Sequence, residues 1–421
     1  MRTREAPLPR SRTAATRTPA IFRLLAVWGP GLLVMLADTD AGNVVTAAQA
    51  GASWGYRLLP LVLLLMPALY MLQELTVRLG IATGKGHGEL IRERFGAGWA
   101  SLSMIGLAAA AIGSLVTEFT AAAGIGELYG LPRRLSLPLA AGFLLAVVAS
   151  RSYRRVERIA LAVGLFELAF FAVLWVAHPS LETIVRQAAD LPLGNAGFAY
   201  LAAAVIGAVF NPWMIFYQQS AVADKGLGAC DCNMARLDTA LGAVLTQLLT
   251  GAVLAAAAAT LAQGDAPVHL ESVGEISRSL SPILGPGAGR FVFSAGVLGA
   301  SLVTAIVASL ALAWGVGEVA GHRRSLAGRP LASGRFFAVY AALVGGAAAL
   351  CWAVPDLVRL NIAAQVLNAF LLPLVVGPLV ALAARVPPVE LRLRGWYLWL
   401  VAGICSIVCG AGLIGGIAGW L

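Results

Sequence analysis

The sequence predicts an all-α membrane protein with eleven transmembrane helices. Of its 421 residues, 59% are hydrophobic and only 12% are charged, whereas a typical soluble domain carries about 25% charged residues. The apolar residues form repeated runs of about 20, the length that a helix needs to cross the ~30 Å hydrocarbon core of a bilayer. Polar residues and a proline interrupt the first and the sixth of these runs, which divides the chain into two five-span halves and a last span.

Eleven apolar segments are candidate spans. They cover residues 24–50, 56–80, 101–125, 135–150, 157–177, 198–220, 237–263, 289–318, 335–352, 357–384 and 396–421. On this basis we expect a first repeat at 24–177, a second repeat at 178–384 and an eleventh helix within 385–421. Residues 1–23 are basic and have no apolar core, so we expect a disordered cytoplasmic tail and no signal peptide.

The chain has a net charge of +9. The placement of its basic residues predicts how the protein is oriented in the membrane and gives no reason to expect a nucleic-acid partner. If the N-terminus is cytoplasmic, most Lys and Arg residues lie in cytoplasmic loops, among them Arg151, Arg154, Arg155 and Arg158. This distribution follows the positive-inside rule. We therefore expect an integral protein of a prokaryotic inner membrane, with an extracytoplasmic C-terminus, surrounded by lipid and without an obligate protein partner.

No cofactor and no catalytic centre are expected. The four histidines, His87, His178, His269 and His322, lie in or beside loops and lack the spacing of a histidine metal site. An intramembrane enzyme would need a nucleophile–base pair or a metal triad at membrane depth, and the sequence offers neither.

The first interruption is the stretch Asp38-Thr39-Asp40-Ala41-Gly42-Asn43 in the middle of residues 24–50. One Asp at the centre of a transmembrane helix costs ~2.5–3.5 kcal/mol, so two carboxylates and an amide require a function there. We expect Asp40 and Asn43 to be ligands of a cation. Asp38 is either a further ligand or a residue that caps a helix end or faces an aqueous vestibule.

The sixth span contains the second interruption, Asn211-Pro212-Trp213. Proline removes a backbone donor and clashes with the carbonyl four residues earlier, so the carbonyl of Ala208 should be free to accept a cation. Paired interruptions at corresponding places in two halves indicate a transport site at the bilayer midplane. We expect Asn211 and the Ala208 carbonyl to join the first interruption there, with Gln365 as a further ligand.

At these residues the chain resembles the Nramp family of divalent-metal transporters, which carry Asp-Pro-Gly-Asn in the first helix and Met-Pro-His in the sixth. The similarity covers nearly the whole chain from about residue 24, including Gly29-Pro30-Gly31, Arg78 to Lys85, Thr117-Glu118, Gln365-Val366 and Leu372-Pro373. It implies a LeuT-like fold of two inverted five-helix repeats with broken helices 1 and 6. It also implies that the substrate is a divalent metal ion, moved by alternating access.

Two departures from the family pattern bear on the metal. Ala41 replaces the motif proline, and Asn211 replaces the motif methionine. A thioether favours soft metals, whereas Mg²⁺ is held by oxygen ligands, often one or two carboxylates, and keeps several waters. The substitutions resemble those of the Nramp-related magnesium transporters, so we expect transport of Mg²⁺, and also of Mn²⁺.

Three further departures concern protons. Trp213 stands in place of the motif histidine, Gln218 in place of a second histidine, and Ala121 in place of a glutamate of the third helix, while Glu118 keeps the neighbouring acid. We therefore expect transport that is uncoupled from protons or only weakly coupled. The alternatives are a conventional proton-coupled Mn²⁺/Fe²⁺ symporter and a symporter of the same fold for amino acids or other organic solutes.

Overall fold

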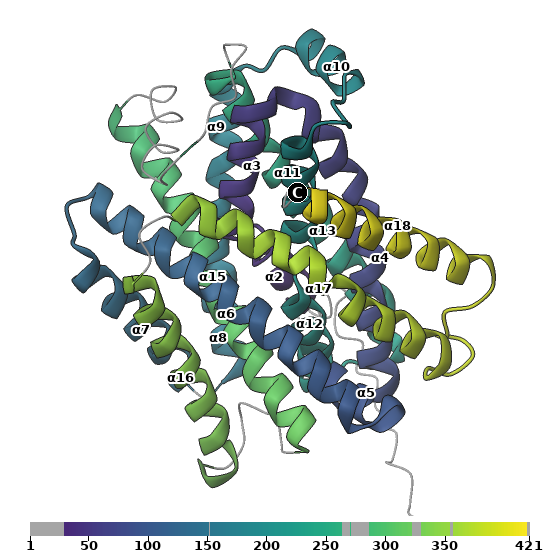
Figure 1. Ribbon diagram of the computed structural model, residues 1–421. Helices are drawn as coiled ribbons and strands as arrows, with labels where there is room; N and C mark the ends of the chain where they lie inside the picture. Colours follow the sequence, from purple (N-terminus) through teal and green to yellow (C-terminus); the bar gives the residue numbers. More distant parts are fainter. Residues whose placement is uncertain are drawn as a thin grey trace, which may run out of the picture.

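Every regular element in the described part of the chain is a helix (Figure 1). The computed structural model describes residues 29–150, 152–262, 270, 286–321, 330–353 and 357–418. The expected tail at 1–23, together with His269 and His322, lies outside these residues. The all-α fold class predicted from composition is confirmed.

Each of the eleven expected segments is helical where the structure describes it. The continuous helices are α4 (Leu59–Thr83), α6 (Ala97–Leu128), α7 (Arg133–Ala149), α13 (Cys232–Leu261), α15 (Pro286–Ala320), α16 (Pro330–Ala353), α17 (Leu357–Arg385) and α18 (Gly395–Ala418). Within the described ranges, eight helical stretches are long and apolar enough to cross a membrane. The protein is therefore an integral membrane protein, and eleven crossings stay a prediction.

Three spans are built from two helices each. The first consists of α2 (Pro30–Leu36) and α3 (Ala41–Trp54), and the sixth of α11 (Ala196–Val209) and α12 (Pro212–Lys225). Both breaks occur where the sequence predicted them. The fifth span was expected to be continuous, but a 3₁₀ turn, η2 (Leu165–Leu168), separates α8 (Tyr153–Gly164) from α9 (Ala169–Ala177).

The two predicted breaks have simple backbone causes. After α2, the N–H groups of Asp38 and Thr39 reach back only three residues, to Met35 and Leu36, and Asp40 is then extended, with φ −68° and ψ 170°. In the sixth span Asn211 is extended because it precedes a proline, and Pro212 starts α12, where its missing N–H is tolerated.

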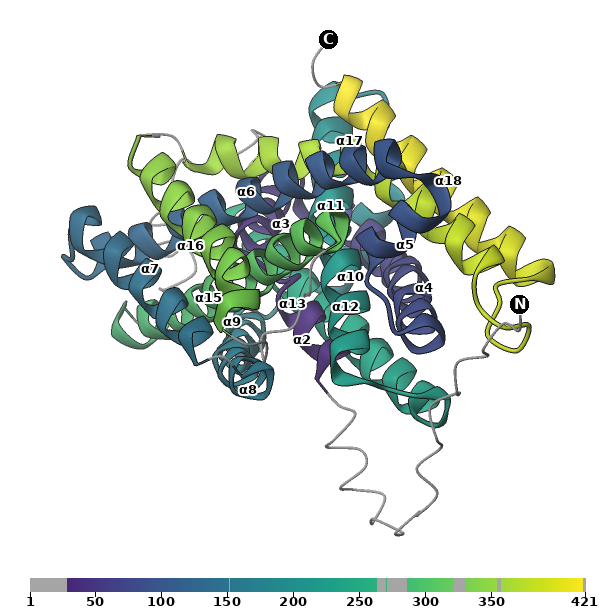
Figure 2. The ribbon, with the colours of Figure 1, turned by 90° about the horizontal axis from the view of Figure 1, so that it is seen from below.

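The broken helices form the centre of the molecule. All residues of α2 except Leu32 are buried, and α12 is buried from Pro212 to Val222. In both views α7 and α16 lie side by side on one flank and α18 on the opposite flank (Figures 1 and 2). The short helices α5 (His87–Phe95) and α10 (Leu181–Ala189) lie towards opposite ends of the molecule (Figure 1). The surrounding helices thus enclose both breaks.

Candidate metal site

Asp40 begins α3 and places its carboxylate at the N-terminus of that helix. Its Oδ1 accepts a hydrogen bond of 2.5 Å from the backbone N–H of Asn43, as an N-capping residue does. Its Oδ2 is buried and has no hydrogen-bond partner. One oxygen of Asp40 is therefore fixed by the helix, and the other is left for a ligand.

Asp38 and Asn43 lie on either side of Asp40. The Asn43 Nδ2 donates to the backbone carbonyl of Asp38 at 2.9 Å, and so connects the two sides of the break. The Asp38 carboxylate is fully buried, and neither of its oxygens has a hydrogen-bond partner. Of the roles left open for Asp38, the helix cap is therefore not formed in this conformation.

The break between α11 and α12 differs from the expectation in one respect. The Ala208 carbonyl is not free, because the Asn211 Nδ2 donates to it at 3.1 Å. The side chain of Asn211 thus takes the place of the amide hydrogen that Pro212 lacks. The Asn211 Oδ1 also has a partner, since the Nδ2 of Asn368 donates to it at 2.5 Å.

Helix α17 brings amide groups to both breaks. Gln365 is buried, and its Oε1 accepts a second hydrogen bond from Asn368 at 2.9 Å. Its Nε2 lies where a Cβ atom on Gly42 would stand, and its backbone oxygen lies where a Cβ on Gly207 would stand. Glycine at positions 42 and 207 therefore allows α17 to approach both broken helices, as the expected role of Gln365 requires.

Two further buried acids lie near Asp40. Glu118, on α6, accepts a hydrogen bond of 3.3 Å from the backbone N–H of Ala41, in the first turn of α3. Glu167, in η2, is completely buried, and neither of its oxygens has a hydrogen-bond partner. The Glu167 carboxylate interacts electrostatically with those of Glu118, Asp40 and Asp38. The four carboxylates therefore influence one another electrostatically, although they are not close enough together to hold one metal ion between them.

Asn368 and Glu167 were not among the residues expected from the sequence. Both were detectable by the reasoning applied to Asp40, because each is a polar side chain inside an apolar run that has to cross the bilayer. Their partners could not be read from the sequence, since Asn368 is 157 residues away from Asn211.

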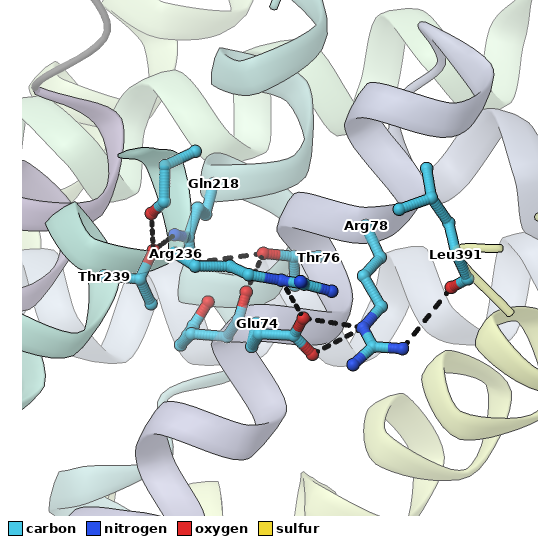
Figure 3. A network of polar contacts seen from close by, with 9 residues as sticks. Glu74, Thr76, Arg78, Gln218, Arg236, Thr239 and Leu391 are labelled. Carbon is cyan, nitrogen blue, oxygen red and sulfur yellow. Dashed lines mark hydrogen bonds and ion pairs between the residues drawn. The ribbon is translucent and has the colours of Figure 1, made fainter. Parts of the chain in front are cut away.

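The positions that replace the family's proton-carrying groups lie on two helices, α6 and α12. Ala121 is buried in α6. Trp213, at the start of α12, donates from its indole Nε1 to the Ser114 hydroxyl at 3.0 Å. Gln218 lies further along α12, where it donates to Thr239 at 2.7 Å and accepts from Thr76 at 3.1 Å (Figure 3).

Gln218 is part of a polar network between α4, α12 and α13 (Figure 3). Within it the buried Glu74 carboxylate receives the Nε–H groups of Arg78 and of Arg236, each at 2.6 Å. Arg78 also donates to the Leu391 carbonyl at 3.4 Å, in the segment between α17 and α18. The predicted orientation assigns this network to the cytoplasmic side of the breaks.

The chemistry around the breaks is that of oxygen ligands. Carboxylates come from Asp38 and Asp40, and amide groups from Asn43, Asn211 and Gln365. In the described ranges no three His, Cys, Asp or Glu side chains are arranged to hold a metal ion. Carboxylate and amide oxygens suit hard divalent cations.

An all-helical membrane fold with two centrally broken helices and buried carboxylates between them defines a transporter of the LeuT-fold class. This chain belongs to the Nramp family, because residues 31–417 match the family described as natural resistance-associated macrophage protein-like.

Known proteins agree with this assignment. The chain is 30% identical over 385 residues to the divalent metal cation transporter MntH of Ralstonia nicotianae, covering 86% of this chain and 84% of that one. It is 31% identical over 309 residues to MntH of Yersinia pestis, covering 70% and 73% of the two chains.

Solved structures show the same fold at low sequence identity. A manganese transporter of Eremococcus coleocola superposes with a TM-score of 0.76 at 16% identity, covering 97% of this chain and 88% of that one. The nucleobase–cation symporter Mhp1 superposes with a TM-score of 0.59 at 14% identity, covering 93% and 90%. The LeuT-like fold implied by the sequence resemblance is thereby confirmed.

Proposed function

We propose that this protein transports divalent metal cations across the membrane by alternating access. The cation would bind between the two breaks, and this site would open first to one side of the membrane and then to the other. Membership of the Nramp family and the MntH relatives support this function. The observation that carries it is the free, buried Oδ2 of Asp40 at the N-terminus of α3. A buried carboxylate oxygen without a donor is costly, and a cation that passes through the site would remove that cost.

The proposed substrate is a hard cation, Mg²⁺ in the first place and Mn²⁺ in addition, as in the magnesium-transporting branch of the family. Asp40 and Asp38 would supply negative charge, and Asn43, Asn211 and Gln365 would supply neutral oxygens. The Ala208 carbonyl, which already accepts from Asn211, would contribute only its second lone pair. None of these groups contains sulfur, which disfavours soft metals. A few ligands of low total charge also suit Mg²⁺, because it gives up its water reluctantly.

The membrane potential alone could drive such transport. Moving two charges through 100 mV releases about 4.6 kcal/mol, enough for a gradient on the order of 10³-fold. Uncoupled or weakly coupled transport is therefore part of the proposal. We also retain the predicted orientation in a prokaryotic inner membrane, with the N-terminus cytoplasmic and the C-terminus extracytoplasmic.

Proton-coupled Mn²⁺ transport is the second candidate function. Uncoupled transport was inferred because Trp213, Gln218 and Ala121 replace the family's proton-carrying residues, and these three positions are the only ones considered. Two buried acids, Glu118 and Glu167, lie near Asp40 and favour the coupled alternative. The Eremococcus coleocola protein that shares this fold is itself a manganese transporter.

Metal uptake into proteoliposomes tests the proposal. We expect uptake of Mg²⁺ and Mn²⁺ well above that of Cd²⁺, with a loss of at least tenfold in Asp40→Ala. Glu93→Ala, at an exposed acid of α5, is the matched control and should transport normally. A strong preference for Cd²⁺ over Mg²⁺ would contradict the hard-cation assignment. The absence of any divalent uptake by the unaltered protein would contradict the function itself.

A further inference from the structure

Glu167 differs from the other buried acids of the described segments. Glu118 accepts a backbone N–H, Asp238 accepts those of Gly29 and Gly31, and Glu318 accepts the Ser220 hydroxyl. Among the acids in these segments, both oxygens are buried without a hydrogen-bond partner only in Asp38 and Glu167. Asp38 already belongs to the candidate metal site. Glu167 comes from a different span and has no assigned role.

The Glu167 side chain lies beside the end of α2. Its Oε1 is 3.6 Å from the position that a Cβ on Gly164 would take, and the Leu36 side chain is next to that same position. The Thr39 hydroxyl of the break interacts favourably with the Glu167 carboxylate, although neither carboxylate oxygen forms a well-aligned hydrogen bond. The same hydroxyl lies 2.7 Å from the Thr246 hydroxyl of α13. Because Leu36 ends α2, Glu167 lies on the predicted cytoplasmic side of Asp40.

The charged groups that act most strongly on Glu167 are acids. Asp38 and Asp40 come from the first break, and Glu118 comes from α6. Helix α15 packs against η2 through Gly299, and its polar residues Ser301 and Thr304, which interact with Glu118 and with the Ala37 carbonyl, are uncharged. The charged residues of α15 that the structure describes, Arg290 and Glu318, lie towards its two ends.

An ionised carboxylate is not stable in this position without a compensating ion. Its burial with no contact better than the Thr39 hydroxyl costs several kcal/mol, and neighbouring carboxylates raise that cost through repulsion. A bound proton removes both penalties, because it makes the group neutral. A divalent cation at Asp40 would offset the repulsion and so favour release of that proton.

We infer that Glu167 is the proton-binding site of this transporter and replaces the proton-carrying groups missing at Ala121, Trp213 and Gln218. The inference rests on the proposed divalent-metal transport, and on protons it takes the second candidate function, coupled transport, in place of uncoupled transport. In the cycle, the Glu167 carboxyl group carries one proton while the metal site is empty. Arrival of the dication at Asp40 breaks the O–H bond of Glu167, the carboxylate keeps the electron pair, and H⁺ passes to cytoplasmic water when α2 moves. Metal and proton then travel in the same direction.

Simultaneous measurement of metal uptake and internal pH in proteoliposomes tests this inference, with Mn²⁺ and Mg²⁺ as probes and the membrane potential clamped. The unaltered protein should acidify the lumen during uptake. Glu167→Gln, which keeps the shape but cannot ionise, should take up metal with at least tenfold less acidification. It should also lose the dependence of uptake on external pH between about 5 and 8.

Two variants control the experiment. Glu318→Gln removes a buried acid that has partners of its own and should leave acidification unchanged. Glu167→Asp keeps an ionisable group and should retain proton movement with a shifted pH midpoint. If Glu167→Gln does not fold, the pH midpoint of proton movement in Glu167→Asp takes its place as the test. A midpoint equal to that of the unaltered protein would contradict the inference.

Three outcomes would overturn the assignment of Glu167. The first is acidification of equal size in Glu167→Gln and in the unaltered protein. The second is metal uptake by the unaltered protein without acidification, which supports uncoupled transport. The third is uptake that requires external Na⁺ and moves no protons, which makes Na⁺ the occupant. Failure of all metal uptake, in contrast, would contradict the proposed function.

Discussion

Asn368 donates its side-chain Nδ2–H to the Asn211 Oδ1 over 2.5 Å, and so joins the middle of α17 to the break between α11 and α12. The Asn211 oxygen is the atom expected to replace the thioether sulfur of the family motif. In this conformation it already has a hydrogen-bond donor. An amide oxygen carries two lone pairs, so a cation that binds at Asn211 would use the one that Asn368 leaves open, and metal binding and the contact with α17 would share one oxygen.

Replacing this oxygen by sulfur should change metal selectivity. In Asn211→Met we expect at least tenfold tighter binding of Cd²⁺ relative to Mg²⁺, because a thioether is a soft ligand. Competition between Cd²⁺ and Mg²⁺ for uptake measures this ratio. Phe210→Met introduces a thioether at the adjacent buried position and should leave the ratio unchanged. An unchanged ratio in Asn211→Met would mean that residue 211 does not ligate the metal.

The contact between Gly42 and Gln365 predicts a specific coupling. A methyl group at position 42 would collide with the Gln365 Nε2, and this amide is the movable end of its side chain. Gly42→Ala should therefore fold but displace Gln365, with about a tenfold loss of metal affinity.

A double-mutant cycle tests this coupling between positions 42 and 365. Adding Gln365→Ala to Gly42→Ala should cost little more, since interacting positions are not additive. The control is Gly113→Ala, whose new methyl would lie 3.8 Å from Ala364 and should be tolerated. Fully additive losses in uptake titrations would contradict the contact.

The ion pairs of Glu74 should contribute strongly to stability. Its side chain is only 2% exposed and faces both Arg78 and Arg236, so Glu74→Gln leaves two guanidinium groups without their anion. Breaking a buried pair costs about 3–5 kcal/mol, and we expect a clear decrease in the Tm of the purified protein.

The matched control for Glu74 is Glu93→Gln. Glu93 pairs with Lys85 at the surface, where its side chain is 45% exposed. Exposed pairs contribute about 0–1 kcal/mol, so the Tm should change little. Equal Tm shifts in the two variants would show that burial of Glu74 does not determine the cost.

His87 should make stability depend on pH. Burial lowers its pKa to about 4, below the value of about 6.5 in an unfolded chain. Between these two values the unfolded chain binds the proton and the folded chain does not. Stability should therefore fall as the pH decreases from about 6.5 to 4, by up to about 3 kcal/mol.

Thermal unfolding across this pH range checks the role of His87. His87→Gln should flatten the dependence of the Tm on pH, because glutamine does not titrate there. His178→Gln, at a histidine that is not buried, should keep the dependence of the unaltered protein. Parallel curves for His87→Gln and the unaltered protein would assign the pH effect to another group.

The sequence predicted both breaks because their causes are local. Pro212 acts on its own helix, and the cost of placing Asp38 and Asp40 in a membrane does not depend on distant partners. The arrangement between helices could not be predicted in the same way. The hydrogen bond from Asn211 to the Ala208 carbonyl depends on a side-chain rotamer, and that from Asn368 depends on how α17 packs. For this reason the carbonyl expected to be free is occupied.

The unexpected turn η2 illustrates a second limit. Residues 165–168 are apolar apart from Glu167 and contain neither glycine nor proline, so no local rule predicts a 3₁₀ turn there. Gly299 of α15 approaches the backbone at Val163 so closely that a Cβ would collide with that carbonyl. Packing between helices that are far apart in the sequence thus determines the local geometry around Glu167.

The hydroxyl groups around the first break affect how α2 can move. Thr304 donates to the Ala37 carbonyl at 2.6 Å, and the Thr39 and Thr246 hydroxyls lie 2.7 Å apart. A hydroxyl hydrogen turns freely about its C–O bond, so these contacts can follow a change in backbone direction. The junction between α2 and α3 can therefore change direction while these two hydroxyl contacts are kept, which suits a hinge that opens once in every turnover.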